Sequence, residues 1–517
     1  MTRRIATPRL ESLFCKHVLI IVMFAAGVAS AGPKVDTGAD RVRTGLSLDM
    51  KRIGTVKPLA FSELGDAGWM VGCECLDRDY ANFEEYKDYL LALGIKKLRL
   101  QTGWAKCEKE KGVYDFAWLD KIIDWAIANG FSPMFGVGYG NPLYADDESK
   151  YIFSRFPTNG EYLEAWKRWL DALAQHFAGR VRDWETWNEA NNITGITAKE
   201  IADNNILTAE IVRRHIPDAR ISGIVLGWLG GYEDILKELK ASGKGDLITY
   251  ASLHLYEINP ENEVSELDEK IKLLAKYLPS AKVRMSESGA PSEMLHSMGF
   301  ANWPFTEVSQ AKLDMRRMLV DHSRGVDSSV FTICDLYYDK RRTVKPAMNA
   351  KGLLAANKAR EVIRIKRAFY AVQNLVTLFD GATLVPKDAS RYVNRDDTIW
   401  MDEYRTRKGY PMVAFWQWQL RVTPYEKKVV EGKKVKRLRL YPMPSDSFET
   451  RPFTFEATGK ALERPVLVDV FSGRVFEFPK EDQVEHSLGI VYANVPVYDS
   501  PFILTDLAAL EGIFAAY

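Results

Sequence analysis

A carboxylic acid and an amide stand side by side at Asn188-Glu189, directly after the bulky, sheet-favouring run Val181–Trp187. Two further amides, Asn191-Asn192, follow at once, which suits the mouth of a cleft better than a hydrophobic core. A glutamic acid at the end of a strand can give a proton to a glycosidic oxygen, and the amide beside it can hold a sugar hydroxyl. The competing interpretation is an ordinary surface glutamate, so the catalytic interpretation needs a second carboxylate.

A second strand-end glutamate occurs at Glu287. The short run Val283–Ser286 leads into it, and Ser288-Gly289 follows. Taken alone, Glu287 has the features of a solvated residue. Two glutamates that both end predicted strands favour a paired-carboxylate site.

These strands belong to a chain in which strand-like and helix-like segments alternate from about residue 69 to 380. The alternation predicts a (β/α)₈ barrel, whose active site lies at the carboxyl ends of its strands. A doubly wound sheet is the alternative, but no glycine-rich phosphate loop follows the first strand, and Gly136, Gly138 and Gly140 come only after the third. The predicted strands are Trp69–Cys75, Lys97–Thr102, Pro133–Val137, Val181–Trp187, Ile221–Val225, Ile248–Leu255, Val283–Ser286 and Ser329–Asp335.

A change of pattern follows the barrel. A predicted helix, Lys358–Phe379, closes it, and beyond Gly381 short strands separated by turns predict a small antiparallel β-sandwich. The segment Arg43–Lys51 is a candidate edge strand for this sandwich. The expected division is a signal peptide at 1–31, an N-terminal segment at 32–66, the barrel at 67–380 and the sandwich at 381–517.

The N-terminus has the pattern of a secretory signal. Basic residues precede the apolar run Val18–Val28, and Ala29-Ser30-Ala31 offers a small-residue cleavage site. The run is short for a membrane anchor, which is the alternative. Cleavage would remove four Lys or Arg and one Glu and change the formal charge from +1 to about −2. We therefore expect a secreted or periplasmic protein, with neither nucleic acid nor a membrane as its partner.

Trp187-Asn188-Glu189 resembles the Trp-Asn-Glu signature that closes the fourth barrel strand of retaining glycoside hydrolases of clan A. Arg367–Leu375 resembles the last barrel helix of these enzymes, and families related to the β-xylosidases, family 39 among them, carry a sandwich after the barrel. The resemblance implies that Glu189 is the acid/base and Glu287 the nucleophile. Ser286-Glu287-Ser288-Gly289 departs from the clan's usual Thr-Glu-aromatic-Gly.

The same resemblance implies further site residues. Asn188 would hold the 2-hydroxyl, and His254 and Tyr256, two residues apart at the end of the sixth strand, would lie on one face near the nucleophile. Arg99, at the end of the second strand, would keep Glu287 ionised. The alternatives are a buried histidine with an ordinary hydrogen bond and a surface salt bridge.

Loops after the strands supply candidates for substrate contacts. Each of these residues, taken alone, is also consistent with packing. The loops Tyr139–Pro157 and Ser288–Thr306 are expected to wall the cleft. The candidates are Trp104, Tyr139, Asn141, Trp228, Trp303 and Tyr337.

The expected function is hydrolysis of O-glycosidic bonds in oligo- or polysaccharides by double displacement, with the pKa of Glu189 raised by burial and by its charged neighbour. A catalytically inactive glycan-binding barrel and a transglycosylase that uses the same two glutamates are the alternatives. No cofactor or metal is expected, because the acidic pairs Asp77/Asp79 and Asp146-Asp147 lack the spacing of an ion-binding loop.

Four cysteines would remain after export, too few for a disulfide scaffold. Cys73 and Cys75 end the first strand, Cys107 follows the second and Cys334 lies in the eighth. Because these strands are neighbours in a closed barrel, we expect Cys107 to reach Cys73 or Cys75, so that a disulfide can form.

Overall fold

The computed structural model describes residues 32–517 apart from 147–148, 150–153, 296–297, 339–346, 420–424, 432–433, 442–443 and 488. The expected signal peptide and parts of the two expected cleft loops lie outside the described residues, and the signal peptide stays a prediction. None of the described helices is long and apolar enough to cross a membrane.

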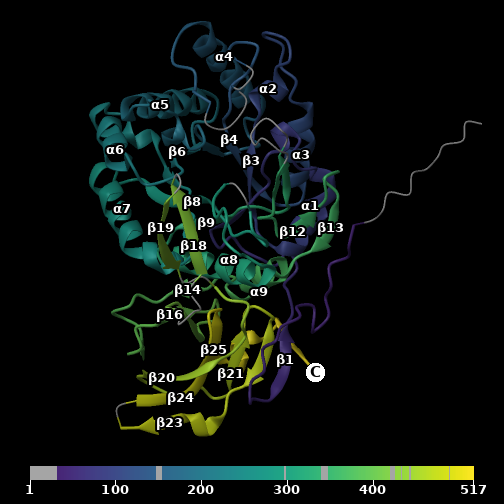
Figure 1. Ribbon diagram of the computed structural model, residues 1–517, viewed down its shortest axis with the longest axis vertical. Helices are drawn as coiled ribbons and strands as arrows, with labels where there is room; N and C mark the ends of the chain where they lie inside the picture. The colour runs from purple at the N-terminus through teal and green to yellow at the C-terminus, as the bar shows by residue number, and fades with distance from the viewer. Residues whose placement is uncertain are drawn as a thin grey trace, which may run out of the picture.

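Eight parallel strands close into a barrel, as predicted (Figure 1). Nearly all of their residues are buried, as is typical of strands covered on both faces. The last strand, β9, pairs with the first, β2, so no edge is left open. The barrel strands are β2 (Trp69–Gly72), β3 (Lys97–Gln101), β4 (Ser132–Gly136), β5 (Asp183–Glu185), β6 (Arg220–Leu226), β7 (Tyr250–Leu253), β8 (Lys282–Ser288) and β9 (Asp327–Val330).

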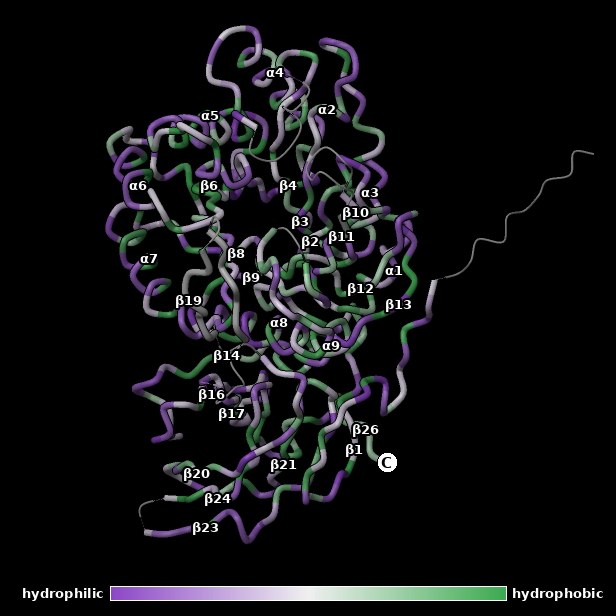
Figure 2. The backbone as a smooth tube through the Cα atoms, in the orientation of Figure 1, coloured by the Kyte–Doolittle hydropathy of each residue, from purple (hydrophilic) through white to green (hydrophobic). Residues whose placement is uncertain are grey.

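Helices surround the barrel. Most of them bury one apolar stripe, whereas α8 and α9 are buried along nearly their whole length. In α4 the stripe consists of Trp166, Trp169, Leu170 and Leu173. Figure 2 shows the resulting mixture of hydrophilic and hydrophobic colour along α5, α6 and α7. The main helices are α1 (Phe83–Leu93), α3 (Ala117–Ala128), α4 (Gly160–His176), α5 (Ala198–His215), α6 (Tyr232–Ala241), α7 (Val264–Tyr277), α8 (Glu307–His322) and α9 (Arg367–Leu378); α2 (Trp104–Cys107) is a single turn.

The last barrel helix is shorter than predicted. It begins at Arg367 and not at Lys358, because Val362–Ile365 forms strand β13, which pairs with β12 (Leu354–Ala356). The β-branched residues of β13 favour this hairpin, and its turn is closed by the hydrogen bond from the Asn357 N–H to the Glu361 carbonyl.

The C-terminal part forms antiparallel sheets packed on a second hydrophobic core, as predicted. The candidate edge strand Arg43–Lys51 is wrong, because it is the following segment, β1 (Arg52–Val56), that joins the larger sheet beside β22 and β26. Not all of the strands beyond Gly381 belong to these sheets: β18 (Tyr425–Glu431) and β19 (Lys434–Tyr441) form a separate two-stranded hairpin. The larger sheet contains β14 (Thr383–Leu384), β16 (Ile399–Arg405), β17 (Pro411–Gln417), β25 (Phe502–Asp506), β21 (Pro465–Asp469), β22 (Arg474–Glu477), β1 and β26 (Phe514–Ala516), and the smaller one contains β15 (Tyr392–Val393), β20 (Arg451–Ala457), β24 (Gly489–Val497) and β23 (Gln483–His486).

The predicted disulfide is not formed: Cys73, Cys75, Cys107 and Cys334 are buried free thiols. The Sγ of Cys107 lies 3.2 Å from the carbonyl oxygen of Thr102 and 3.4 Å from the indole nitrogen of Trp118. The thiol therefore faces its own loop and helix α3.

A buried ion pair joins the barrel to the larger sheet. Arg316 of α8 donates two hydrogen bonds to Glu261, of 2.8 and 2.6 Å, and Trp416 of β17 donates a third at 2.6 Å. Both charged side chains are fully buried. Removing one member of such a pair leaves the other charge without compensation.

We therefore predict that Glu261→Ala destabilises the protein by about 3–5 kcal/mol, the typical cost of breaking a buried pair. Thermal unfolding followed by circular dichroism gives the loss, and tryptophan fluorescence reports the altered surroundings of Trp416. Glu266→Ala, at an exposed position of α7, is the control and should change stability by less than about 0.5 kcal/mol. Equal melting curves for the two variants would contradict the prediction.

Candidate active site

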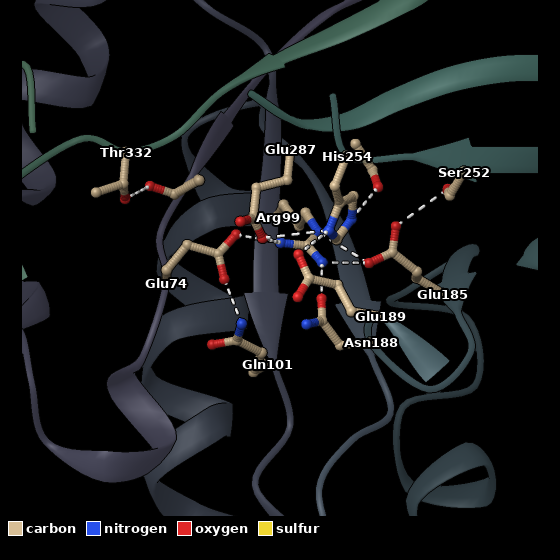
Figure 3. Close-up of polar contacts among 12 residues, drawn as sticks. Glu74, Arg99, Gln101, Glu185, Asn188, Glu189, Ser252, His254, Glu287 and Thr332 are labelled. Atoms are coloured by element: carbon tan, nitrogen blue, oxygen red, sulfur yellow. Dashed lines mark hydrogen bonds and ion pairs between the residues drawn. The ribbon is translucent and has the colours of Figure 1, made fainter. Parts of the chain in front are cut away.

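Polar side chains from several strands converge at the carboxyl end of the barrel (Figure 3). Glu189 follows β5, His254 follows β7 and Glu287 lies in β8. One carboxylate oxygen of each glutamate and a ring nitrogen of His254 all lie within 4.8 Å of one another. Among the described residues, these three are the group of side chains close enough together to hold a metal ion; the expectation that no metal is bound stays a prediction.

Arg99 of β3 lies at the centre of this site and is 1% exposed. Its Nη1 donates to Glu287 at 3.0 Å and to Glu74 at 2.6 Å, and its Nε and Nη2 donate to Glu185 at 2.8 and 2.5 Å. The planar guanidinium suits this role because it offers donors in several fixed directions. Arg99 thus lies beside Glu287, as expected, and the surface salt bridge considered as the alternative is wrong.

The direction of the Glu287 side chain is set by an irregularity in strand β8. The pairing of β8 with β9 shifts register between Met285 and Ser288, a change that redirects side chains in a strand. Both Ser286 and Glu287 can consequently approach His254, at 2.9 and 3.7 Å. The hydroxyl of Tyr256 donates to the second oxygen of Glu287 at 2.7 Å.

Glu189 is held by its neighbours on two sides. Asn192 donates to Oε2 at 2.9 Å, and Nδ1 of His254 lies 3.1 Å from Oε1. The backbone of Glu189 has a φ of 48°, in the left-handed region that non-glycine residues rarely adopt. Gly227 packs against this side chain so closely that a Cβ there would lie 3.0 Å from Cδ of Glu189.

The expected rise in the pKa of Glu189 is wrong for the free protein. Burial acts to raise this pKa, but the hydrogen bond and charge of His254, together with Asn192 and Arg99, outweigh it and lower the pKa below its usual value. In turn, burial acts to lower the pKa of His254, while the carboxylates of Glu287 and Glu189 raise it overall. The proton of this pair is therefore held mainly by the histidine.

Two buried glutamates were missed by the sequence analysis. Glu185 also accepts a hydrogen bond from Ser252 at 3.1 Å, and Arg99 and His254 lower its pKa although burial opposes them. Glu74 also accepts a hydrogen bond from Gln101. Burial raises the pKa of Glu74 to about 7 against the opposing effect of Arg99. The only signal in the sequence was an acidic residue within each apolar strand segment.

Asn188 accepts a hydrogen bond from Nη2 of Arg99 at 2.8 Å through Oδ1. This contact sets the direction of the amide, so its nitrogen is the atom that can donate to a ligand.

Several of the predicted loop residues are packing residues. Trp104 is buried and stacks on Tyr144, Tyr162 and Trp169. Tyr139 packs edge-on against Trp187. Asn141 donates to the carbonyl of Glu108. Trp303 belongs to a buried cluster with Phe300 and Phe305.

Trp228 and Tyr337 differ from these residues. Trp228 is 54% exposed. Tyr337 is half-buried, and its backbone N–H donates to the carbonyl of Tyr80 at 3.1 Å.

A further buried residue that sequence reasoning missed is Lys351, in the loop between β11 (Ala347–Asn349) and β12. Its Nζ lies 5.2 Å from the centre of the Tyr256 ring. Burial lowers the pKa of Lys351 to about 8, although the carboxylates of Glu287, Glu189 and Asp314 oppose the change.

Neither a family model nor a curated protein matches the chain. Solved structures do match it, and they show that the fold is that of the clan A barrels of families 39 and 30. A family 39 glycoside hydrolase from Bacteroides cellulosilyticus WH2 is 14% identical over 87% of this chain and 83% of its own, with a TM-score of 0.62. A family 39 enzyme from Xanthomonas axonopodis pv. citri is 17% identical, covering 90% and 99%, with a TM-score of 0.55. A family 30 endoxylanase from Clostridium papyrosolvens C71 is 11% identical, covering 88% and 97%, with a TM-score of 0.51.

The raised pKa of Glu74 predicts a pH-dependent effect on stability. Because the pKa in the folded state, about 7, lies above the usual 4.5, the bound proton stabilises the fold fully below pH 4.5, and this contribution is lost as the pH rises through 7. Glu74→Gln cannot ionise. The free energy of unfolding of this variant relative to that of the parent should therefore rise between pH 5 and 8, with a slope of at most about 1.4 kcal/mol per pH unit.

The glutamine also places an amide nitrogen opposite Gln101, which costs stability equally at every pH. The test therefore uses the change of this stability difference with pH and not its size at any one pH. Glu84→Gln, on the exposed side of α1, serves as control and should follow the parent at each pH. Parallel curves for Glu74→Gln and the parent would show that Glu74 ionises normally in the folded protein.

Proposed function

We propose that this protein is a retaining glycoside hydrolase that cleaves O-glycosidic bonds in oligo- or polysaccharides. The observation that carries the proposal is the closeness of two carboxylates at the carboxyl end of the barrel, where an oxygen of Glu189 and one of Glu287 lie within 4.8 Å. Retaining enzymes place these groups about 5–5.5 Å apart, while inverting enzymes need about 6.5–9.5 Å to admit a water molecule. The similarity to glycosidase folds supports a carbohydrate as the substrate.

In the first step, Glu287 attacks the anomeric carbon as the bond to the leaving oxygen breaks. Arg99 and Tyr256 each donate to a different oxygen of Glu287, which fixes the direction of the attacking carboxylate. The product of the step is a glycosyl ester on Glu287. Asn188 donates from its amide nitrogen to the 2-hydroxyl of the same sugar.

Glu189 supplies the proton that the leaving oxygen takes up. Since the Glu189–His254 pair holds that proton mainly on the histidine, it first crosses their 3.1 Å hydrogen bond from Nδ1 to Oε1. In the second step, water attacks the ester, its proton returns to Glu189, and Glu287 leaves as a carboxylate. His254 is thus the positioning residue that stores a proton between turnovers.

Trp228 is placed to receive the leaving group. It follows Gly227, which touches Glu189, and Asn191 fixes both residues by accepting from the Gly227 N–H at 3.1 Å and donating to the Trp228 carbonyl at 2.8 Å. The ring lies against Gly230, where a Cβ would collide with it, and stays more than half exposed. An exposed aromatic ring on a fixed loop beside the acid is a stacking surface for a sugar.

Two alternatives use the same site. An inactive glycan-binding barrel would have no need for a complete set of donors around both carboxylates. A transglycosylase would share every contact described above and differ only in its acceptor. Product analysis with and without an added sugar acceptor distinguishes it from a hydrolase.

The two glutamates should respond differently to replacement. Glu287→Ala removes the nucleophile and should abolish turnover of every glycoside, whatever its leaving group. Glu189→Ala should largely preserve the first step for a dinitrophenyl glycoside, which needs little protonation, but the glycosyl-enzyme should accumulate. Azide, which needs no base, should then restore turnover with a product of retained configuration, measurable by NMR.

Glu481→Ala, on the surface of the C-terminal sheets, is the control and should match the parent. The assignment of roles fails if azide leaves Glu189→Ala unchanged, or if it rescues Glu287→Ala with retained configuration.

Trp228→Ala should lower kcat/KM for an oligosaccharide by about fivefold, as expected for one lost stacking contact of about 1 kcal/mol. The glycosyl fluoride of the same sugar should be unaffected, because fluoride leaves no ring for Trp228 to contact. Trp228→Tyr should retain most of the activity. An equal loss on both substrates would place Trp228 outside the leaving-group site.

A further inference from the structure

An acid that the proposed double displacement does not use shares a hydrogen-bond donor with the nucleophile. Glu74, two residues after β2, is 1% exposed. Nη1 of Arg99 donates to Glu74 at 2.6 Å and to Glu287 at 3.0 Å (Figure 3). Because this nitrogen carries two hydrogens, one of them points to each carboxylate. A change of charge on either glutamate therefore acts on the other across a single atom.

The position of Glu74 is fixed by contacts that do not involve the nucleophile. On one side of it, the Cys73 N–H donates to the carbonyl of Arg99 at 2.8 Å. On the other side, the Cys75 N–H donates to Oε1 of Gln101 at 2.7 Å. Since the oxygen of this amide accepts from the backbone, its nitrogen faces Glu74 and donates to it. The backbone on both sides and the Gln101 amide thus hold Glu74 against Arg99.

The charges around Glu74 do not balance. Arg99 is the cation that contacts it, and this one guanidinium also binds the carboxylates of Glu185 and Glu287. Burial and the repulsion of the two other carboxylates raise the pKa of Glu74 to about 7, against the attraction of Arg99. The neighbouring thiols and phenol are uncharged at neutral pH, because burial raises the pKa values of Cys73, Cys75 and Tyr86. Glu74 is therefore the member of the cluster that gains and loses a proton near neutral pH.

The proposed reaction changes the charge of this cluster. In the first step, Glu287 passes from an anion to an uncharged ester. The repulsion of Glu74 by Glu287 then disappears, and Arg99 has lost one of its counter-charges, so the ionised form of Glu74 becomes more favourable. In the second step, Glu287 leaves as a carboxylate, which favours the protonated form of Glu74 again.

We propose that Glu74 is a positioning residue that balances the charge of the nucleophile: it releases its proton to solvent as Glu287 is esterified and takes up a proton as Glu287 is set free. The inference rests on the proposed function, because it needs the glycosyl ester. The O–H bond of Glu74 is the one additional bond that breaks and forms. Arg99 then faces the same number of anions before and after each step, and an ionised Glu74 stabilises the ester and the transition state that leads to it.

A kinetic test uses Glu74→Gln, which cannot ionise. The value of kcat/KM for nitrophenyl glycosides depends on the steps up to ester formation, which an ionised Glu74 favours. The ionised fraction of Glu74 in the parent grows as the pH rises through about 7. The ratio of kcat/KM in the parent to kcat/KM in the variant should therefore increase between pH 5 and 8, by about tenfold, the low end of the effect of a neighbouring charge. A merely structural role would give the same ratio at every pH.

Glu185→Gln is the matched control. It also removes a carboxylate from Arg99, but Glu185 has a lowered pKa and is ionised throughout this pH range, so its effect on kcat/KM should be constant with pH. For a dinitrophenyl glycoside, kcat depends on hydrolysis of the ester. Glu74→Gln should leave this kcat unchanged or raise it, because an uncharged group favours the return of Glu287 to the carboxylate. An equal loss of kcat and kcat/KM overturns the proposal.

A second measurement uses the parent protein and does not depend on the folding of a variant. The glycosyl-enzyme is trapped at pH 6 with the dinitrophenyl 2-deoxy-2-fluoro glycoside of the sugar that the parent hydrolyses. The infrared difference spectrum should show the loss of the C=O band of a protonated carboxyl group, as Glu74 ionises, beside the new band of the ester. Asp314, whose pKa burial raises to about 8, keeps its proton in both states and cancels from the difference.

Mass spectrometry of the trapped protein separates this proposal from the proposed function. If no glutamate is labelled, the proposed function fails and the role of Glu74 fails with it. If Glu287 is labelled but no carboxyl band is lost, or if the ratio for Glu74→Gln does not change with pH, the glycosidase stands and the role of Glu74 is overturned.

Discussion

The site depends on one buried guanidinium. Arg99 joins side chains from the first, fourth and seventh strands of the barrel, because Glu74, Glu185 and Glu287 all accept its hydrogen bonds. Three carboxylates so close together would repel one another without a cation between them. Arg99 therefore allows several acidic side chains to lie together at the carboxyl end of the barrel. The closed barrel brings the ends of these strands close to one another.

Around this centre, neighbouring acids differ in their protonation because their partners differ. Glu185 faces Arg99 and has a lowered pKa, while burial raises the pKa of Glu74 to about 7. Glu189 is paired with His254, which holds the proton of the pair. Environments that push similar groups apart in pKa allow one small site to contain both a proton donor and an anionic nucleophile.

The C-terminal sheets are attached to the barrel by polar contacts as well as by apolar packing. Arg316 and Lys312, both on α8, are fully buried and bind Glu261 and Asp499, the second of which belongs to the C-terminal part. Lys312 also donates to the carbonyls of Ser445 and Ser447, at 2.8 and 2.6 Å. The same helix contacts the loops of the site, because Asp314 accepts from the Ala290 N–H and Gln310 donates to the Lys351 carbonyl, so it joins the site to the C-terminal sheets.

The sequence by itself determined the barrel, the C-terminal sheets and the strand ends at which Asn188, Glu189, His254 and Glu287 stand. Arg99 was also predicted at a strand end, but it lies in the middle of β3. These properties follow from local periodicity and from the position of polar residues after apolar runs, both of which can be read without knowing any contact. The hairpin β12–β13 was missed because pairing between its strands, not the helical pattern of the segment, decides its conformation.

Only the tertiary structure decided which residues are buried and which charges meet. Trp104 and Trp303 looked as suitable for substrate contact as Trp228, but the first two are enclosed by side chains from other parts of the chain and the third is not. Lys351 carries no motif, and its nearness to Tyr256 arises from a loop about 95 residues further along the sequence. The direction of the Glu189 pKa likewise depends on the distance to His254, since hydrogen bonds and charges act through space and not along the chain.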